Sequence, residues 1–559
     1  MKSARLNGHA SGGVRFVKGV AWGLVALYFL LCAAATQAQA TYYVSETGND
    51  RNDGLSPAAP WKSLSKVSRT RFQPGDTIKF KAGETFQGQL RVSSSGDADD
   101  ALTYTRYGEG ERPLLDAGNE RRGAPVATIL IEDQDHLILS GLEVRNFRQR
   151  SRENIDDANA FGVLIKNTGR RSLKGFELFD LEVRDVYPVK RRKAFNANTV
   201  SGIRVETRPS KAGVAVVKTS DIFIHDNVIR FSGRFGIAVR HRAPTNKSAA
   251  NLADHYDENV RIVNNLCEDL GGSCVLLNGV NNGLLESNTF LRSGSLRNKA
   301  LSVTRGSGAW FFRSKNIVAQ YNAAIGSRGH NDSSGLHVDF GNENVLVQYN
   351  FFYDNEGYGT EILGKNKNVI WRYNVSVGDG SRVPRVARPE GNKSQFPGKT
   401  VFVSDYAAPK RILCEDIELH NSTYVTFEKT ELQIELNGRN VHLMNNAFIA
   451  VPESRIGSRV TVVWNDQKGP QLSHNVFSGL VSPAFTSLDA FAQTINVDLD
   501  PEGTSLDDFA MPEGLRGVSL EHPPFPAAGS GIFSHVSEVP LNDIFGKPLT
   551  QEAPQVGAG

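Results

Sequence analysis

A short alternating segment that closes on Asn recurs along this chain, and this repeat constrains the fold more than any other feature. Nine copies are visible, among them "DIFIHDN", "NVLVQYN" and "NVHLMNN". Their closing residues are Asn227, Asn265, Asn288, Asn322, Asn350, Asn374, Asn421, Asn446 and Asn475. The gaps between successive asparagines run from 23 to 47 residues. Such self-similarity indicates a repeat protein in which each repeat forms one structural unit.

One repeat cannot bury its apolar residues alone, so successive repeats must stack and hydrogen-bond strand to strand. A turn of three short strands with tight corners takes a little more than ~20 residues, and longer gaps correspond to loops inserted at a corner. Asn suits a corner because it tolerates a left-handed backbone, and a column of Asn side chains can form amide hydrogen bonds up the stack. We therefore predict an all-β fold, a right-handed parallel β-helix of roughly ten to twelve coils.

The composition fits a soluble, strand-rich protein. Of 559 residues, 53 are Gly and three are Met, a balance that favours turns and strands over helix bundles. The net charge is +3 and no basic block dominates, so we do not expect nucleic acid as a partner.

The first 40 residues have the features of a secretory signal peptide. Arg5, Arg15 and Lys18 precede an apolar run over residues 20–35, and "AQA" at residues 38–40 provides small residues for cleavage. The run is short for a transmembrane helix, although a retained N-terminal anchor is the alternative. We expect the mature protein to begin near Thr41, to have no membrane span, and to be secreted or periplasmic.

Export would leave three cysteines, Cys267, Cys274 and Cys414. In an oxidising compartment Cys267 and Cys274 could form a disulfide, or they could be buried thiols between stacked strands. The cysteine spacing does not resemble a zinc site.

The repeat also suggests the domain organisation. After about Phe477 it fades into a Pro- and Asp-rich sequence. We expect the β-helix to occupy residues 41–480, with residues 481–559 as a C-terminal cap that protects the last strand edges. We expect a monomer.

Three segments resemble secreted bacterial β-helix proteins. They are "TYYVSETGNDRNDGLSPAAPWKSLSKV" (residues 41–67), "FQPGDTIKFKAGETFQGQL" (residues 72–90) and "PLNDIFGKPLTQEAPQVGAG" (residues 540–559). This group is pectate-lyase-like and includes polysaccharide lyases and glycoside hydrolases. The resemblance spans nearly all of the expected mature chain and implies a polysaccharide substrate, but the fold alone does not define the reaction.

Aligning the strand before each Asn-terminated strand predicts which side chains face outward, because side chains alternate along a strand. The columns predicted to face the core contain Ile237, Cys274 and Leu336, and beside them Val239, Leu276, Trp310 and Val338. The columns predicted to face solvent contain Ala238, Val275, Ala309 and His337, and beside them Arg240, Leu277, Phe311 and Asp339. Glu361 falls where this alignment expects an inward residue, which indicates a shifted register or a carboxylate at a corner.

Hydrolysis of a glycosidic bond needs one protonated carboxyl group and one ionised carboxylate. Asp339 is the first candidate, and the other catalytic candidates are Asp332, Asp354, Glu361 and His337. This region resembles the acidic stretches "GFD-D" and "YNYSHDN-GG" of hydrolase-like β-helix proteins. Asp339 and "YNFFYDNEG" match these stretches, whereas Leu336 and His337 replace the expected residues. The candidates for substrate binding are Arg240, Phe311, Trp310, His330 and Glu356.

Asp354 and Glu356 also fit a structural role, because acidic residues are favoured in turns. Asp269 follows its ladder Asn by four residues, as Asp354 follows Asn350. That column therefore fits turn chemistry as well as catalysis.

Two other functions stay open. β-Elimination from a uronic-acid polymer needs a base and a group that neutralises the substrate carboxylate. Basic residues such as Arg240, or calcium held by acidic pairs such as Asp332 and Asp339, could supply them. No other cofactor is predicted. The third function is a non-catalytic binding scaffold or adhesin, but unequal insertions near the middle coils favour an enzyme.

Overall fold

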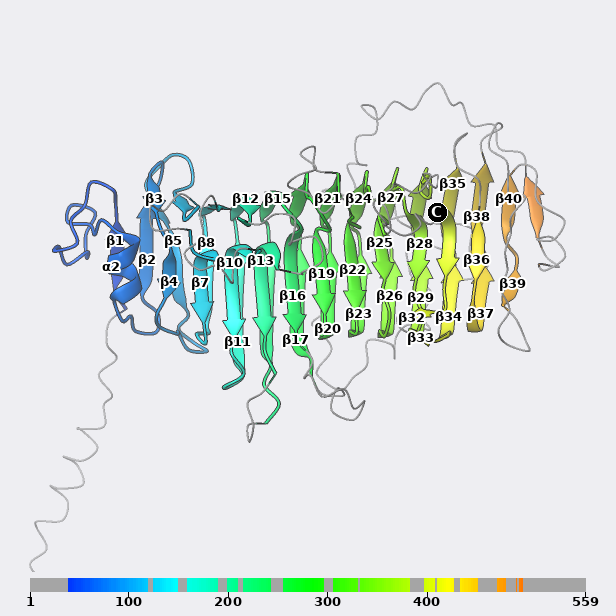
Figure 1. Cartoon of the computed structure of the whole chain (residues 1–559), viewed down its shortest axis with the longest axis horizontal. Coiled ribbons are helices and arrows are strands. Elements are labelled where there is room, and N and C mark those ends of the chain that lie inside the picture. Colours follow the sequence, from blue (N-terminus) through cyan, green and yellow to red (C-terminus); the bar gives the residue numbers. More distant parts are fainter. Residues whose placement is uncertain are drawn as a thin grey trace, which may run out of the picture. The chain divides into compact units, whose positions relative to one another are not determined.

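Parallel strands stacked in three long sheets make up the described fold from Thr41 onward (Figure 1). The computed structural model describes residues 39–118, 124–148, 158–189, 199–209, 215–242, 255–295, 305–329, 332–382, 397–407, 410–426, 433–450, 470–478, 489 and 492–495. The chain runs through sheet 1, sheet 2 and sheet 3 in turn and then returns to sheet 1, so that each circuit is one coil.

Sheet 1 has 14 strands: β1 (Thr41–Val44), β2 (Thr77–Lys81), β5 (Leu102–Tyr107), β8 (Leu137–Ser140), β11 (Leu173–Phe179), β14 (Thr219–His225), β17 (Asp257–Val263), β20 (Val280–Glu286), β23 (Lys315–Gln320), β26 (Glu343–Gln348), β29 (Lys367–Arg372), β34 (Cys414–His420), β37 (Gly438–Met444) and β39 (Gln471–Ser473).

Sheet 2 has 14 strands: β3 (Thr85–Gln87), β6 (Leu114–Asp116), β9 (Glu143–Phe147), β12 (Glu182–Tyr187), β15 (Val228–Ser232), β18 (Leu266–Glu268), β21 (Thr289–Leu291), β24 (Ala323–Ile325), β27 (Phe351–Tyr353), β30 (Val375–Val377), β35 (Thr423–Thr426), β38 (Ala447–Ala450), β40 (Val476–Ser478) and β41 (Gln493–Ile495).

Sheet 3 has 11 strands: β4 (Leu90–Val92), β7 (Ala127–Glu132), β10 (Ala160–Asn167), β13 (Val200–Thr207), β16 (Phe235–His241), β19 (Val275–Asn278), β22 (Ala309–Phe312), β25 (Leu336–Val338), β28 (Tyr358–Ile362), β31 (Lys399–Val403) and β36 (Ile434–Leu436).

These sheets confirm the predicted right-handed parallel β-helix. Eleven strands in sheet 3 agree with the predicted number of coils, and sheets 1 and 2 extend the stack to 14 strands. Two small elements lie outside the sheets: helix α2 (Leu64–Arg69), whose N-cap is Ser63, and an antiparallel pair, β32 (Tyr406–Ala407) with β33 (Lys410–Arg411).

The predicted C-terminal cap stays a prediction. Strand β41 extends sheet 2 into that segment by pairing with β40. Most of the rest of residues 481–559 lies outside the described residues, as do residues 1–38 of the predicted signal peptide. In the part of the chain that is described, no helix is long and apolar enough to cross a membrane.

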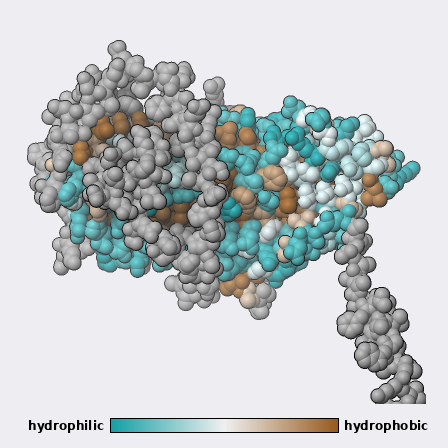
Figure 2. Space-filling model, turned by 180° about the vertical axis from the view of Figure 1, so that it is seen from behind, coloured by the Kyte–Doolittle hydropathy of each residue, from teal (hydrophilic) through white to brown (hydrophobic). Residues whose placement is uncertain are grey.

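Apolar side chains from all three sheets fill the interior of the solenoid. One continuous buried cluster runs from Val44 in β1 to Phe477 in β40. On the face shown in Figure 2, the described residues are mainly hydrophilic, with apolar residues gathered in patches between them. This distribution follows from strand alternation, which turns every second side chain into the core.

The predicted Asn ladder is present at the corner between sheets 1 and 2. From Asn227 to Asn350, and again at Asn446, the Asn side chain donates from Nδ2 to Oδ1 of the Asn one coil further on, at 2.9–3.1 Å. The rungs are Asn227, Asn265, Asn288, Asn322, Asn350 and Asn374, followed by Asn446 and Asn475. These rungs are buried, so the ladder satisfies amide groups that water cannot reach.

One predicted rung is wrong. Asn421 does not occupy the ladder; Ser422 does, accepting from the N–H of Asn374 and donating its own N–H to Asn446. The residue before each rung has a positive φ, and Asn421 (53°) occupies that position, as Tyr349 (55°) does before Asn350. The left-handed residue therefore precedes the rung, whereas the sequence pattern predicted both features on one Asn.

Ser422→Asn is expected to stabilise the protein by about 1 kcal/mol, because an amide would restore the side-chain bonds that a hydroxyl cannot form. Urea denaturation of both proteins measures the change. A loss of stability in this variant would mean that packing around residue 422, rather than the ladder, decides which side chain fits there.

Cys267 and Cys274 form a disulfide, which settles the alternative that the sequence left open. Cys414 is a buried free thiol. Among the described residues the disulfide joins β18 to the segment that leads into β19, next to the sheet that holds the acidic cluster.

Candidate active site

The register of sheet 3 differs from the predicted one in two coils. The observed outward column runs through Ala238, Leu276, Trp310 and His337. The inward columns run through Ile237, Val275, Ala309 and Leu336, and through Val239, Leu277, Phe311 and Val338. The predicted assignment was therefore one residue out at β19 and β22, and such a shift exchanges the two faces of a strand.

Phe311 and Trp310 consequently exchange roles. Phe311 is fully buried in the core, so its predicted contact with substrate is wrong. Trp310 lies on the outer face, partly exposed, and its ring stacks on His337 with the centroids 5.6 Å apart. Val338 pairs with Ile362, which places Glu361 beside His337 on the same face. The misfit of Glu361 in the predicted alternation thus reflected the register.

Asp332 lies in the segment that leads into β25 and forms an ion pair with Arg305. Nε and Nη2 of Arg305 lie 2.7 and 2.6 Å from Oδ2 of Asp332, so this pair leaves Oδ1 unused. The next residue, Ser333, has a φ of 142°, a backbone conformation that non-glycine residues rarely adopt. Arg382 donates to the carbonyl oxygen of Asp332 at 3.2 Å. These contacts fix the carboxylate at the approach to β25.

Asp339 directly follows β25, and two stacked asparagines hold its backbone. Nδ2 of Asn342 and Nδ2 of Asn366 donate to the carbonyl oxygen of Asp339 at 2.6 and 2.7 Å. The two amides also bond to each other at 3.0 Å. Oδ1 of Asp339 accepts from the N–H of Phe340 at 2.8 Å. A second, shorter Asn ladder therefore positions this carboxyl group.

His337 lies between the acidic side chains. Its Nε2 is 4.0 Å from Oδ2 of Asp339, and its Nδ1 is 3.7 Å from Oε2 of Glu361. Oγ of Ser307 lies 2.8 Å from Nδ1. Asp332 interacts electrostatically with this histidine. The structure thus brings together four of the five predicted catalytic residues.

The pKa values of Asp339 and Asp332 shift in opposite directions. Burial, and then the charge of Asp332, raises the pKa of Asp339 to about 7. Burial opposes the ionisation of Asp332, but its contacts, chiefly with Arg305, outweigh burial and hold the pKa of Asp332 below its ordinary value. Burial lowers the pKa of His337 to about 4, so this imidazole is neutral near pH 7. The cluster therefore offers a proton donor and a carboxylate at the same pH.

Exposure separates the carboxyls that can meet a substrate from those that cannot. The side chains of Asp332 and Asp339 are 25% and 15% exposed, whereas those of His337 and Glu361 are 1% and 2% exposed. Burial and the charge of Asp332 raise the pKa of Glu361, and Ser334 donates to its Oε2 at 2.5 Å. Glu361 therefore lies behind the cluster as a neutral supporting carboxyl.

Asp354 and Glu356 bind Arg328 instead of joining the cluster. Asp354 forms an ion pair with Arg328, and Oε1 of Glu356 lies 3.8 Å from Nε of the same guanidinium. Oε2 of Glu356 also accepts from the N–H of Gly329 at 3.1 Å. Asp354 has a φ of 51°, close to the 52° of Asp269, which supports the turn role. These contacts hold the segment that leads to Asp332.

The structure describes one of the two remaining substrate-binding candidates, Arg240 and His330. Arg240 faces outward in β16, next to Asn278 of β19. His330 lies outside the described residues. In the described ranges, no group of three or more His, Cys, Asp or Glu side chains is arranged to hold a metal ion.

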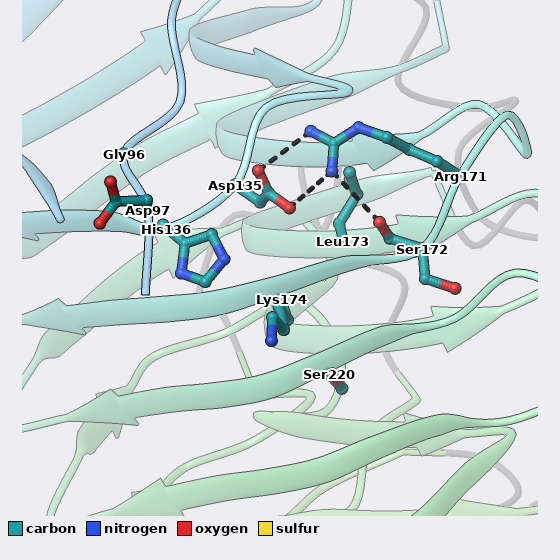
Figure 3. Close-up of a pocket in the computed structure, with 9 residues that line it drawn as sticks. All are labelled: Gly96, Asp97, Asp135, His136, Arg171, Ser172, Leu173, Lys174 and Ser220. Atoms are coloured by element: carbon teal, nitrogen blue, oxygen red, sulfur yellow. Dashed lines mark hydrogen bonds and ion pairs between the residues drawn. The ribbon is translucent and has the colours of Figure 1, made fainter. Parts of the chain in front are cut away.

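A surface cavity of about 400 Å³ lies far along the stack from this cluster (Figure 3). Its lining residues come from residues 96–97, from the turn before β8, from the start of β11 and from β14. The ion pair of Arg171 with Asp135 forms one wall. The cavity contains none of the predicted site residues, and its chemistry does not resemble that of the acidic cluster.

Sequence reasoning missed Arg305, Ser307 and the clamp of Asn342 and Asn366. Asn342 and Asn366 are 24 residues apart, which is the spacing of a short coil, so this second ladder could have been found in the sequence. Arg305 carried no such signal, because it reaches Asp332 only after the coils stack.

No protein-family model matches the chain. A lacto-N-biosidase of Bifidobacterium longum subsp. longum is 24% identical over 530 residues, an alignment that covers 79% of this chain and 31% of the relative. The chain therefore spans about a third of the length of this curated relative.

Solved structures of a GH136 lacto-N-biosidase from Eubacterium ramulus have the same fold. The selenomethionine derivative has a TM-score of 0.53 and 21% identity, covering 82% of this chain and 70% of that one. The native protein has a TM-score of 0.51 and 19% identity, covering 85% and 70%. The structures confirm the β-helix, and the sequence similarity confirms the predicted resemblance to glycoside hydrolases of this fold.

Proposed function

We propose that this chain is a glycoside hydrolase whose catalytic carboxyl groups are those of Asp332 and Asp339. The supporting observation is that two partly exposed carboxyls of one cluster have pKa values displaced in opposite directions. Paired groups of this kind supply the acid and the ionised partner that glycoside hydrolysis needs. The similarity to lacto-N-biosidases, which are glycoside hydrolases, points the same way.

In this proposal Asp339 gives its proton to the glycosidic oxygen while the bond from that oxygen to the anomeric carbon breaks. The carboxylate of Asp332 either attacks the anomeric carbon or takes a proton from the water that does so. Water supplies the hydroxyl on the sugar, and the proton that this water releases restores the acid form of Asp339. Arg305 keeps Asp332 ionised, and neutral His337 adds no charge beside Asp339.

The substrate would be an oligosaccharide or polysaccharide. The protein would be a monomer and would act outside the cytoplasm. The disulfide between Cys267 and Cys274 supports export, because such bonds persist in oxidising compartments. Lacto-N-bioside linkages are the first to test, and neutral and uronic-acid polymers follow.

The test follows new reducing ends and the ultraviolet absorbance of unsaturated products on an aryl lacto-N-bioside, neutral polysaccharides and uronic-acid polymers. Hydrolysis predicts reducing ends without unsaturated product. Unsaturated product would establish β-elimination instead. If no substrate yields either product, a binding scaffold would be favoured.

The pH profile on the best substrate should have an alkaline limb near pH 7. The general acid must be protonated, and the pKa of Asp339 is about 7, so kcat/KM should fall about tenfold per pH unit above that value. Because the pKa of Asp332 is lowered, the acid limb should lie below the ordinary carboxyl range. A rate that keeps rising to pH 9 would contradict the role of Asp339.

A further inference from the structure

A row of side chains connects the acidic cluster to an arginine on the outer face of sheet 3. Arg240 pairs with Asn278, and Asn278 pairs with Phe312. Phe311 pairs with Val338, so Phe312 is the neighbour of Asp339 in this row. Adjacent coils lie about 4.8 Å apart, which places Arg240 about 14 Å from the proton donor. The row thus offers one side chain for each coil.

Arg240 has an unusual charge environment for a half-buried guanidinium. Among the described residues no ion pair is formed by its side chain, although Glu206 lies beside it in β13. Glu206 instead binds Arg242 at 3.0 Å and approaches Arg208 at 4.0 Å. Burial and the charge of Arg242 lower the pKa of Arg240, and Arg313 adds to this effect, while the charge of Glu206 opposes it only in part. A positive charge that is partly removed from water in this way is stabilised by an anion.

The side chains between Arg240 and Asp339 suit a sugar chain. Phe312 is partly exposed, and its ring packs edge-on against Phe340 with the centroids 4.5 Å apart. Such a ring can contact the apolar face of a sugar, and Asn278, although only 9% exposed, adds an amide that can bond to a hydroxyl group. The spacing of the coils is close to the length of one sugar unit, so a glycan lying along the row would meet one side chain per unit.

We propose that Arg240 binds an acidic sugar residue of the substrate, about three units from the bond that is cleaved. The planar guanidinium fork matches the two oxygens of a carboxylate or those of a sulfate ester. The position of the cleaved bond in this inference rests on the proposed function. The binding of the acidic group rests only on the row of outward side chains from Arg240 to Asp339.

The test measures binding, so it does not depend on turnover. Hexasaccharides of hyaluronan, polygalacturonate, alginate and chondroitin 6-sulfate are titrated into the full-length protein by calorimetry, each beside its carboxyl-reduced counterpart. At least one acidic glycan should bind about 10- to 100-fold more tightly than its reduced form, as a charge-assisted bond to a guanidinium implies. If carboxyl-reduced chondroitin 6-sulfate still binds more tightly than the other carboxyl-reduced glycans, the sulfate is the bound group.

Arg240→Met should abolish this preference. Arg261→Met is the matched control, because Arg261 is a half-buried guanidinium on the outer face of sheet 1 that lies 4.3 Å from the ring centroid of Phe223. That control should keep the preference, and thermal unfolding should show both variants folded. Equal binding of acidic and reduced glycans by the wild type, or a preference that survives in Arg240→Met, would overturn the inference.

The outcomes also separate this inference from the proposed function. Hydrolysis of glycans without any preference for acidic ones would overturn the acidic subsite and leave the hydrolase intact. Binding that depends on Arg240, with no reducing ends released from any substrate, would support the subsite and count against hydrolysis.

Discussion

Asp339→Asn is expected to lower kcat by about a thousandfold while the protein stays folded. A positioned general acid contributes roughly 10²- to 10⁴-fold to the rate, and an amide cannot give up a proton to the glycosidic oxygen. The fold should survive, because the clamp of Asn342 and Asn366 holds the backbone carbonyl of residue 339 and not its carboxyl group. The measurement is kcat on the best substrate, with circular dichroism and thermal unfolding as the checks on folding.

Asp354→Asn is the matched control for this variant. It removes one carboxylate from a side chain that binds Arg328 instead of the cluster. Asn tolerates the positive φ of residue 354, so this variant should keep kcat within about threefold. Near-normal turnover in Asp339→Asn, or an equal loss in both variants, would remove Asp339 from the mechanism.

A comparison of substrates with different leaving groups adds an independent readout. An aryl leaving group of low pKa needs little protonation, so Asp339→Asn should retain much more activity on such a substrate than on a natural glycan. A merely structural defect would lower both activities in parallel. The contrast therefore distinguishes a proton donor from a residue that only shapes the site.

The fold could be predicted because its signal is local and repeated. Each Asn rung, such as Asn350 in "NVLVQYN", sits in a short segment whose alternation is visible without knowledge of its neighbours. The rung at Ser422 shows the limit of that signal. Asn421 carries the expected residue type but occupies the left-handed position one residue earlier.

The candidate site was harder to predict, because its faces depend on register between coils. The exchange of Trp310 and Phe311 followed from a shift of one residue, and sequence alternation alone does not fix the pairing of one coil with the next. Asp339 and His337 were assigned to the correct face because the inward and outward positions of β25 were predicted correctly. Arg305 was missed because it lies 27 residues before Asp332 and meets it only through stacking.

Asn322→Leu is expected to destabilise the protein by about 4 kcal/mol, the largest stability effect predicted here. Leu has a similar volume but forms none of the five side-chain hydrogen bonds of this rung, which involve Asn288, Asn350 and backbone carbonyls. Each buried polar group left without a partner costs ~1–3 kcal/mol, although some of these groups keep a second bond. Urea denaturation, followed by circular dichroism, measures the loss.

Asn227→Leu, at the first rung, provides a graded control. The side chain of Asn227 makes three such bonds, so the loss should be smaller than at Asn322. In a stack whose units contact only their neighbours, an interior break also uncouples the coils on either side of it. Asn322 directly precedes β24, and β24 leads into the segment that carries Asp332. The interior variant should therefore lose activity at urea concentrations where Asn227→Leu remains active, and equal losses at both rungs would show that the ladder acts only locally.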